Sequence, residues 1–299
     1  AGATAVGVLG AVTWVSAGRP GWNAEPVAAA SPVAAQPAPA ASSPIGAISG
    51  PQQAASAAVP AVAASPATTT APILPTLDAS SLTAAWPSLP RDELREALDM
   101  ARVRGWTVEV VQTREFDNEA FRKNDGTRCY YCKQELFGTM EGIVRKRGIR
   151  WIAYGELADD ALDPTRVGSK AARERGVRAP LAEAGITKED VRALSRVRGL
   201  NTWDKPSFAC LASRVPRNTP VDPETMRRVE AAEACLRAQG FRQYRARHHG
   251  DLCRIELEPE DLPRLLDPAV RTAVLAGIAA AGYRYVTVDL AGYRTGSTA

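Results

Sequence analysis

Three cysteines are the most reactive side chains of this sequence. Cys210 lies in the segment Lys-Pro-Ser-Phe-Ala-Cys-Leu-Ala-Ser-Arg at 205–214, which has neither helical nor strand periodicity and is predicted to be an ordered loop. Cys129 and Cys132 form a Cys-x-x-Cys pair at the start of a predicted helix. The positive end of that helix dipole is expected to lower the pKa of both thiols. We expect the three cysteines to meet in space and to handle sulfur.

The spacing of the thiols leaves their chemistry open. Two thiolates can occupy two corners of a metal site, form a redox disulfide, or have no chemical role, and a closed zinc site needs four ligands. Adding Cys210 makes a set of three, which leaves one corner of a cubane iron–sulfur cluster open to a ligand such as sulfide. The other two cysteines, Cys235 and Cys253, lie among apolar helix positions and inside a strand. They are predicted to be buried and inert.

Two acidic residues, Asp159 and Asp160, follow a predicted strand at 149–154. Ligands of open α/β sheets bind beside the carboxyl ends of the strands, so this pair could hold Mg²⁺ or ribose hydroxyls. The alternative is an acidic loop that caps a helix.

A predicted hairpin at 241–257 places Arg245 and Arg247 on one face of its first strand, and Glu256 on one face of its second. Two arginines one pleat apart suit a phosphate or a carboxylate. The alternative is an exposed sheet face with ion pairs between its side chains.

The remaining elements follow from periodicity and from turn residues. Helices are predicted from 90 to 105, over 130–146, from 187 to 199, over 223–239 and within 259–281, and strands over 106–113, 149–154 and 283–290. Helices that alternate with strands at this spacing predict βαβ units and a parallel sheet over 81–203. Residues 204–299 are predicted to form a smaller α+β domain. Residues 1–80, rich in Ala, Pro, Ser and Thr, are predicted to hold no packed domain, either as disordered chain or as a poorly defined gene start.

Composition limits the class of partner and the compartment. A length of 299 residues allows two domains of about 150 residues each. The net charge of +4 balances 37 Lys and Arg against 33 Asp and Glu, which argues against a nucleic-acid partner. Five cysteines, an odd number, fit a reducing compartment, so a cytoplasmic location is expected. The uncharged first 18 residues lack the basic start of a signal peptide, and neither a secretory signal nor a membrane partner is expected.

Four motifs follow one another along the chain. They are Arg-Cys-Tyr-Tyr-Cys-Lys-x-Glu-Leu-Phe from 128, Asp-Lys-Pro-Ser-Phe-Ala-Cys-Leu-Ala-Ser-Arg from 204, Arg-x-Arg-His-His-Gly-Asp-Leu-x-Arg-Ile-Glu from 245 and Tyr-x-Tyr-Val-x-x-Asp-Leu-x-Gly-Tyr-Arg from 283. Together they resemble the LarE family of ATP-dependent sulfur transferases, which belongs to the PP-loop ATPase superfamily. The resemblance covers roughly 85 to 297. It implies a Rossmann-like PP-loop fold, of the adenine nucleotide alpha hydrolase-like type, whose parallel sheet is incomplete at its N-terminal end.

The resemblance also implies an activity. Members use ATP to adenylate a carboxylate of pyridinium-3,5-biscarboxylic acid mononucleotide, and sulfur then replaces AMP on the way to the nickel-pincer nucleotide cofactor of lactate racemase. Some members sacrifice one cysteine sulfur and keep dehydroalanine, whereas others hold a [4Fe–4S] cluster on three cysteines, as Cys129, Cys132 and Cys210 would here. The implied site adds Glu233, Arg245, Arg247 and Glu256 as catalytic residues, Ser213 and Arg214 as substrate ligands, and Asp159 and Asp160 for nucleotide and Mg²⁺. A homo-oligomer is also implied.

The sequence departs from the family pattern at three places. The Ser-Gly-Gly-x-Asp-Ser loop that cradles pyrophosphate is not found, Leu157 replaces an Asn, and Arg217-Asn218 replaces Tyr-Gly. These departures favour an alternative function, a non-catalytic remnant that folds, and binds a cluster or zinc, without activating ATP. A further alternative is another PP-loop enzyme such as a tRNA thiolase, against which the modest charge argues.

Overall fold

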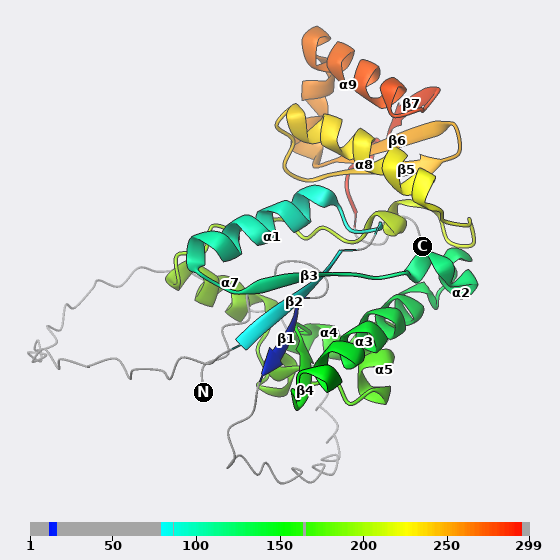
Figure 1. Cartoon of the computed structure of the whole chain (residues 1–299). Coiled ribbons are helices and arrows are strands. Elements are labelled where there is room, and N and C mark those ends of the chain that lie inside the picture. Colours follow the sequence, from blue (N-terminus) through cyan, green and yellow to red (C-terminus); the bar gives the residue numbers. More distant parts are fainter. Residues whose placement is uncertain (1–11, 17–78, 86, 164–165, 295–299) are drawn as a thin grey trace, which may run out of the picture. The chain divides into compact units, whose positions relative to one another are not determined.

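The computed structural model describes residues 12–16, 79–85, 87–163 and 166–294 (Figure 1). Most of the predicted low-complexity region, and residues 164–165 and 295–299, lie outside the described residues. Among the described helices, none is long and apolar enough to cross a membrane.

The first sheet has the strand order β3-β2-β1-β4. Its strands are β1 (Val12–Ser16), β2 (Ala79–Ala85), β3 (Val108–Gln112) and β4 (Trp151–Tyr154). Strands β2 and β3 are parallel, whereas β1 is antiparallel to both β2 and β4. The sheet is therefore mixed and not the parallel sheet that was predicted.

Strand β1 lies within the region 1–80, which was predicted to hold no packed domain. Its sequence, Val-Thr-Trp-Val-Ser, consists largely of the β-branched and aromatic residues that favour strands. Composition alone gave no sign of this short run, because the chain around it is rich in Ala and Pro. Since β1 is reversed relative to both neighbours, β2, β3 and β4 still run in the same direction.

The helices beside this sheet follow the predicted periodicity. Helix α1 (Arg91–Arg104) ends at Gly105, which takes the left-handed φ of 68° that glycine tolerates. Helix α3 (Arg128–Lys146) buries Leu136, Phe137, Met140 and Val144 against β4 and its neighbours. The shorter elements are η1 (Glu115–Asp117), α2 (Glu119–Arg122), α4 (Ala158–Ala161), α5 (Gly168–Glu174), α6 (Pro180–Glu183) and α7 (Lys188–Val197).

The C-terminal region has a three-stranded sheet of order β5-β6-β7, whose first two strands form the predicted hairpin around Gly250. Its elements are η2 (Leu211–Arg214), α8 (Pro223–Ala238), β5 (Tyr244–His249), β6 (Leu252–Leu257), η3 (Pro259–Leu266), α9 (Pro268–Ala280) and β7 (Tyr285–Val288). Helix α8 packs against β5 and α9, and β7 adds in parallel to β6. These elements form the predicted α+β region.

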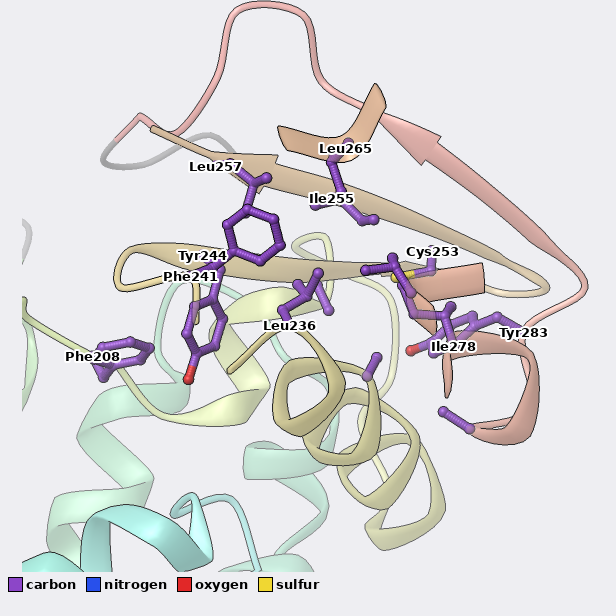
Figure 2. Close-up of a cluster of buried hydrophobic side chains, with 14 residues drawn as sticks. Phe208, Leu236, Phe241, Tyr244, Cys253, Ile255, Leu257, Leu265, Ile278 and Tyr283 are labelled. Carbon is purple, nitrogen blue, oxygen red and sulfur yellow. The ribbon is translucent and has the colours of Figure 1, made fainter. Parts of the chain in front are cut away.

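One face of this sheet and the two helices enclose an apolar core (Figure 2). Leu236 of α8 and Ile278 of α9 meet Ile255 and Leu257 of β6, and all four are at most 1% exposed. Cys253 is fully buried in the same cluster, as predicted, whereas Cys235, also predicted to be buried, is only partly so. Because side chains alternate along a strand, the charged residues of β5 and β6 lie on the opposite face.

Candidate functional site

The segment that displays Cys210 is an irregular loop up to the cysteine, as predicted, and then turns into the short 3-10 helix η2. Its backbone is fixed at both sides of the thiol. The Leu211 amide donates to the Ser88 carbonyl over 2.7 Å, and Arg245 Nη2 donates to the Ser207 carbonyl over 2.6 Å. Cys210 itself is partly buried.

Arg214 holds the middle of this segment from inside the protein. Its Nη1 atom lies 2.6 Å from the Ala209 carbonyl and 3.1 Å from the Cys210 carbonyl. Its Nε and Nη2 atoms donate to the two carboxylate oxygens of Glu233 over 2.7 and 3.0 Å. The side chain is fully buried, and these contacts all lie within the chain.

Glu233 connects this arginine to the second sheet. The carboxylate lies on α8, and its Oε1 atom also accepts a hydrogen bond of 3.1 Å from the Ala246 amide of β5. Both charges are therefore paired and hydrogen-bonded, which is what a buried ion pair needs to offset its desolvation.

Arg247 and Glu256 form a second buried pair, 2.7 Å apart, on the polar face of the hairpin. Arg247 Nη1 donates to the Ser213 carbonyl over 3.0 Å, so this pair also contacts the cysteine segment. Arg254 extends the network from Glu256 to Asp289. The alternative prediction for the hairpin was an exposed sheet face with ion pairs. The ion pairs are present, but the face is buried.

Arg245 differs from the other arginines of this face. Its guanidinium lies between the rings of Phe208 and Tyr293, 4.7 and 4.8 Å from their centroids, and is 3% exposed. Among the described residues, no carboxylate lies within 4.0 Å of it to form an ion pair. Burial, and then the charge of Arg214, lower the pKa of Arg245 to about 10. An anion at this place would relieve that cost.

The Cys-x-x-Cys pair begins α3 and is tied to the Cys210 segment by its neighbours. Arg128 Nη1 donates to the Ala212 carbonyl over 2.8 Å, across 84 positions of sequence. The Asn124 amide donates to the Pro216 and Thr219 carbonyls, each over 2.9 Å.

Cys132 and Cys210 pack against the same apolar cluster, which includes Phe121 and Leu211. The structure therefore brings these two segments together, as expected from the resemblance.

The guanidinium of Arg128 interacts electrostatically with all three sulfurs. Burial acts to lower the pKa of Arg128, but the neighbouring Cys210, Cys129 and Cys132 outweigh it and raise the pKa. Burial raises the pKa of Cys132, and the charge of Cys210 adds to the effect. The prediction that the helix dipole lowers the pKa of Cys132 was therefore wrong, because desolvation of the thiolate exceeds the dipole.

These thiols have the donor chemistry of an iron–sulfur site but not its arrangement. Among the described residues, no group of three or more His, Cys, Asp or Glu side chains is placed to hold a metal ion. All five cysteines are free, and Cys129 is exposed.

Asp159 and Asp160 make the contacts of the capping alternative. Asp159 accepts from the Lys188 amide over 2.7 Å at the start of α7, and Asp160 pairs with Arg166 over 2.7 Å. A carboxylate oxygen of Asp160 also accepts from the Leu157 amide over 3.4 Å. The pair lies just beyond β4, as expected.

Sequence reasoning missed the two residues that join the cysteine segments, Asn124 and Arg128. Asn124 is 1% exposed and has a left-handed φ of 53°. Its sequence context, Lys-Asn-Asp-Gly, indicates a turn but not a buried amide. Arg128 adjoins Cys129 within a quoted motif, and that adjacency was the available signal. Asn218, which replaces the family's glycine, also takes a left-handed φ, of 64°, that Asn tolerates.

Fold and site together define a mixed α/β protein in which a cysteine segment is held between a Cys-x-x-Cys helix and a buried arginine network. No model of a known protein family matches the chain. An uncharacterised protein of Synechocystis sp. is 39% identical over 219 residues, 73% of this chain and 81% of that protein. The pyridinium-3,5-bisthiocarboxylic acid mononucleotide synthase of Lactiplantibacillus plantarum is 32% identical over 205 residues, 69% of this chain and 73% of the synthase. The chain belongs to the LarE family.

Proposed function

We propose that this chain is an ATP-dependent sulfur transferase with a PP-loop fold. Its substrate would be pyridinium-3,5-biscarboxylic acid mononucleotide, and its product the thiocarboxylate that leads to the nickel-pincer nucleotide cofactor. Support comes from family membership and from the name of the relative in Lactiplantibacillus plantarum.

The observation that carries the proposal is the position of Cys210. Its segment is fixed by buried side chains, and its thiol shares the surroundings of Arg128 with Cys129 and Cys132. ATP would convert a substrate carboxylate to an acyl adenylate, with release of pyrophosphate. A thiolate could then attack the carbonyl carbon, so that a C–S bond forms as the C–O bond to AMP breaks. If the nucleophile is Cys210, loss of its Cα proton and cleavage of its Cβ–Sγ bond would release the thiocarboxylate and leave dehydroalanine. If the nucleophile is a sulfide supplied from elsewhere, the thiocarboxylate would form directly and Cys210 would stay intact.

Arg245 is the residue that we propose to bind the substrate's anionic groups. It is a buried cation flanked by two aromatic rings and unpaired with any described carboxylate within 4.0 Å. A phosphate or carboxylate matches the planar fork of a guanidinium. Ser213, Arg247 and Glu256 adjoin this position in our proposal, and Glu233 and Arg214 support it from within.

Asp159 and Asp160 are proposed to contact ATP and Mg²⁺ beyond the end of β4. The present contacts of both residues, with the Lys188 amide and with Arg166, would then have to rearrange. The missing Ser-Gly-Gly-x-Asp-Ser loop makes ATP use the step most in need of a test.

The test mixes the full chain, under anaerobic conditions, with ATP, Mg²⁺ and the pyridinium substrate. Pyrophosphate release that requires the substrate, followed by a product in which sulfur replaces oxygen, is expected. Cys210→Ser should retain pyrophosphate release and lose the sulfur product, because adenylation precedes the step that needs the thiol. Cys253→Ser, at a buried core position, serves as the control.

Mass spectrometry of the protein after turnover then separates the two sulfur sources. Dehydroalanine at position 210 would show that Cys210 gives up its own sulfur, and an intact Cys210 would show that the sulfur arrives from elsewhere. Absence of pyrophosphate release would overturn the proposal and favour the non-catalytic remnant, which the lack of a phosphate loop supports.

A further inference from the structure

We infer that Arg214 is a positioning residue that orients Cys210 through the two peptide groups on either side of it. This inference rests on the proposed role of Cys210. Arg214 Nη1 donates to the carbonyl of Ala209 and to the carbonyl of Cys210 itself. These two carbonyls belong to the peptide planes that flank the Cys210 α-carbon. Fixing both planes fixes the backbone dihedrals of Cys210 and hence the direction of its Cα–Cβ bond.

The guanidinium is in turn fixed by the core of the C-terminal region. Its other two nitrogens donate to both oxygens of Glu233, and Glu233 accepts from the Ala246 amide on β5. A continuous hydrogen-bonded path therefore runs from β5 through α8 to the backbone at Cys210. Only arginine can supply this geometry, because its planar fork donates in several fixed directions, whereas a lysine ammonium is a point charge on a flexible stem.

Three arginines contact different parts of the segment that contains Cys210. Arg245 contacts the carbonyl of Ser207 and Arg247 contacts the carbonyl of Ser213, so these two fix its ends. Arg214 contacts the middle, where the thiol is. All three of its nitrogens have partners within the chain, which suits a support for the thiol. A misplacement of about 1 Å at a reacting group can cost roughly 100-fold in rate, so such a support matters for a nucleophile.

The test measures the chemical reactivity of individual thiols without substrate. The full-length protein is treated with iodoacetamide, and alkylation rates of Cys210, Cys129 and Cys253 are followed by peptide mass spectrometry. In Arg214→Lys we expect Cys210 to react on the order of tenfold faster, because loss of the two carbonyl contacts lets its segment open locally. Cys129 and Cys253 should keep their rates.

The matched control is Arg228→Lys. Arg228 also holds two carbonyls in the same region, those of Gly250 and Gly282, and its ring contact is with Tyr283. None of these contacts involves the Cys210 segment, so the replacement of Arg228 should leave the Cys210 rate unchanged even if the protein is destabilised.

A second variant covers the case in which Arg214→Lys does not fold. Glu233→Gln keeps the shape of the partner but removes its charge, so the guanidinium is held less firmly and the Cys210 rate should rise by a smaller factor. In Arg214→Ala, added methylguanidinium should slow Cys210 alkylation again.

An unchanged Cys210 rate in Arg214→Lys, or in Glu233→Gln if only that variant folds, would overturn the inference. So would equal rises at Cys210 and Cys253, which indicate global loosening. Failure of the proposed function is a separate result, because it shows in the sulfur product of Cys210→Ser and not in alkylation rates.

Discussion

Arg214 and Glu233 are charged residues that the fold removes almost completely from solvent, at 0% and 5% exposure. A buried ion pair gains little net stability over an apolar pair, because desolvation offsets the attraction. Removing one partner is different, since it leaves the other charge buried without compensation. The pair therefore makes the cysteine segment dependent on both residues.

Glu233→Ala is accordingly expected to lower the free energy of unfolding by about 3–5 kcal/mol, the usual cost of breaking a buried pair from one side. Urea denaturation followed by circular dichroism measures it. Glu224→Ala is the matched control on the same helix, where an exposed pair with Arg227 predicts a change within about 0.5 kcal/mol. Equal effects of the two substitutions would contradict the importance assigned to burial.

The pKa of Cys132 could not be predicted from its local sequence. The sequence places it in the first turns of a helix, and the dipole of that helix was expected to lower its pKa. The structure packs it against an apolar cluster, and burial raises the pKa instead. The cluster is formed by residues distant in sequence, such as Val221 and Met226, so no local pattern reports it.

At the scale of elements, the hairpin of β5 and β6 contains both histidines of the chain. His248 is buried, and its Nδ1 atom lies 3.1 Å from the Tyr283 hydroxyl. Burial, then the charges of Arg228 and His249, lower the pKa of His248 below its ordinary value of 6.5, against a smaller opposing effect of Asp222. Protonation of this side chain therefore disfavours the folded hairpin.

We expect stability to fall as the pH is lowered from 7.5 to 5. A folded-state pKa below the unfolded value means that the unfolded chain binds the proton more readily, so the stabilising contribution is complete above pH 6.5 and is lost below it. Urea unfolding of the wild type and of His248→Gln, measured across this range, tests the assignment. His248→Gln should have a shallower pH dependence.

His249→Gln is the companion variant, since burial lowers the pKa of His249 as well but its side chain is more exposed. It should remove a smaller part of the slope. A slope unchanged in the double variant would show that carboxylates, and not histidines, set the pH dependence.

Helices and strands whose ends are marked by nearby residues could be predicted from the sequence. Pro90 and Gly105 bracket α1, and Thr187 and Asp190 form the predicted reciprocal cap of α7. The hairpin register follows from a turn at Gly250 and from alternation of apolar residues. In each case the determining residues lie within one or two turns of the element they define.

At the scale of the molecule, the contacts that matter most join distant segments, and single-sequence patterns do not contain them. Strand β1 pairs with β2 and β4 across long stretches of chain, and its reversed direction could not be inferred from composition. The meeting of Cys132 with Cys210 was expected from the reactivity of the cysteines and from a family resemblance, and not from any local periodicity. The side chains that bring it about, Asn124 and Arg128, have no local periodicity.

This meeting predicts a specific chemical cross-link. Cys132 and Cys210 pack against one apolar cluster, and the charge of one affects the other. A short reagent that alkylates two thiols should therefore join the peptides that contain them in the folded protein, and peptide mass spectrometry identifies the product. Urea should abolish it, because the two residues are far apart in sequence.

Single substitutions show whether the cross-link depends on the arrangement of the two segments. Cys132→Ser should eliminate it and Cys235→Ser, on α8 and outside this cluster, should leave it intact. Arg128→Lys should reduce its yield without removing either thiol, since Arg128 holds the Ala212 carbonyl beside Cys210. If Cys129 and Cys132 cross-link only to each other, the two segments do not meet in solution, and the shared thiol site on which the proposed sulfur chemistry depends does not form.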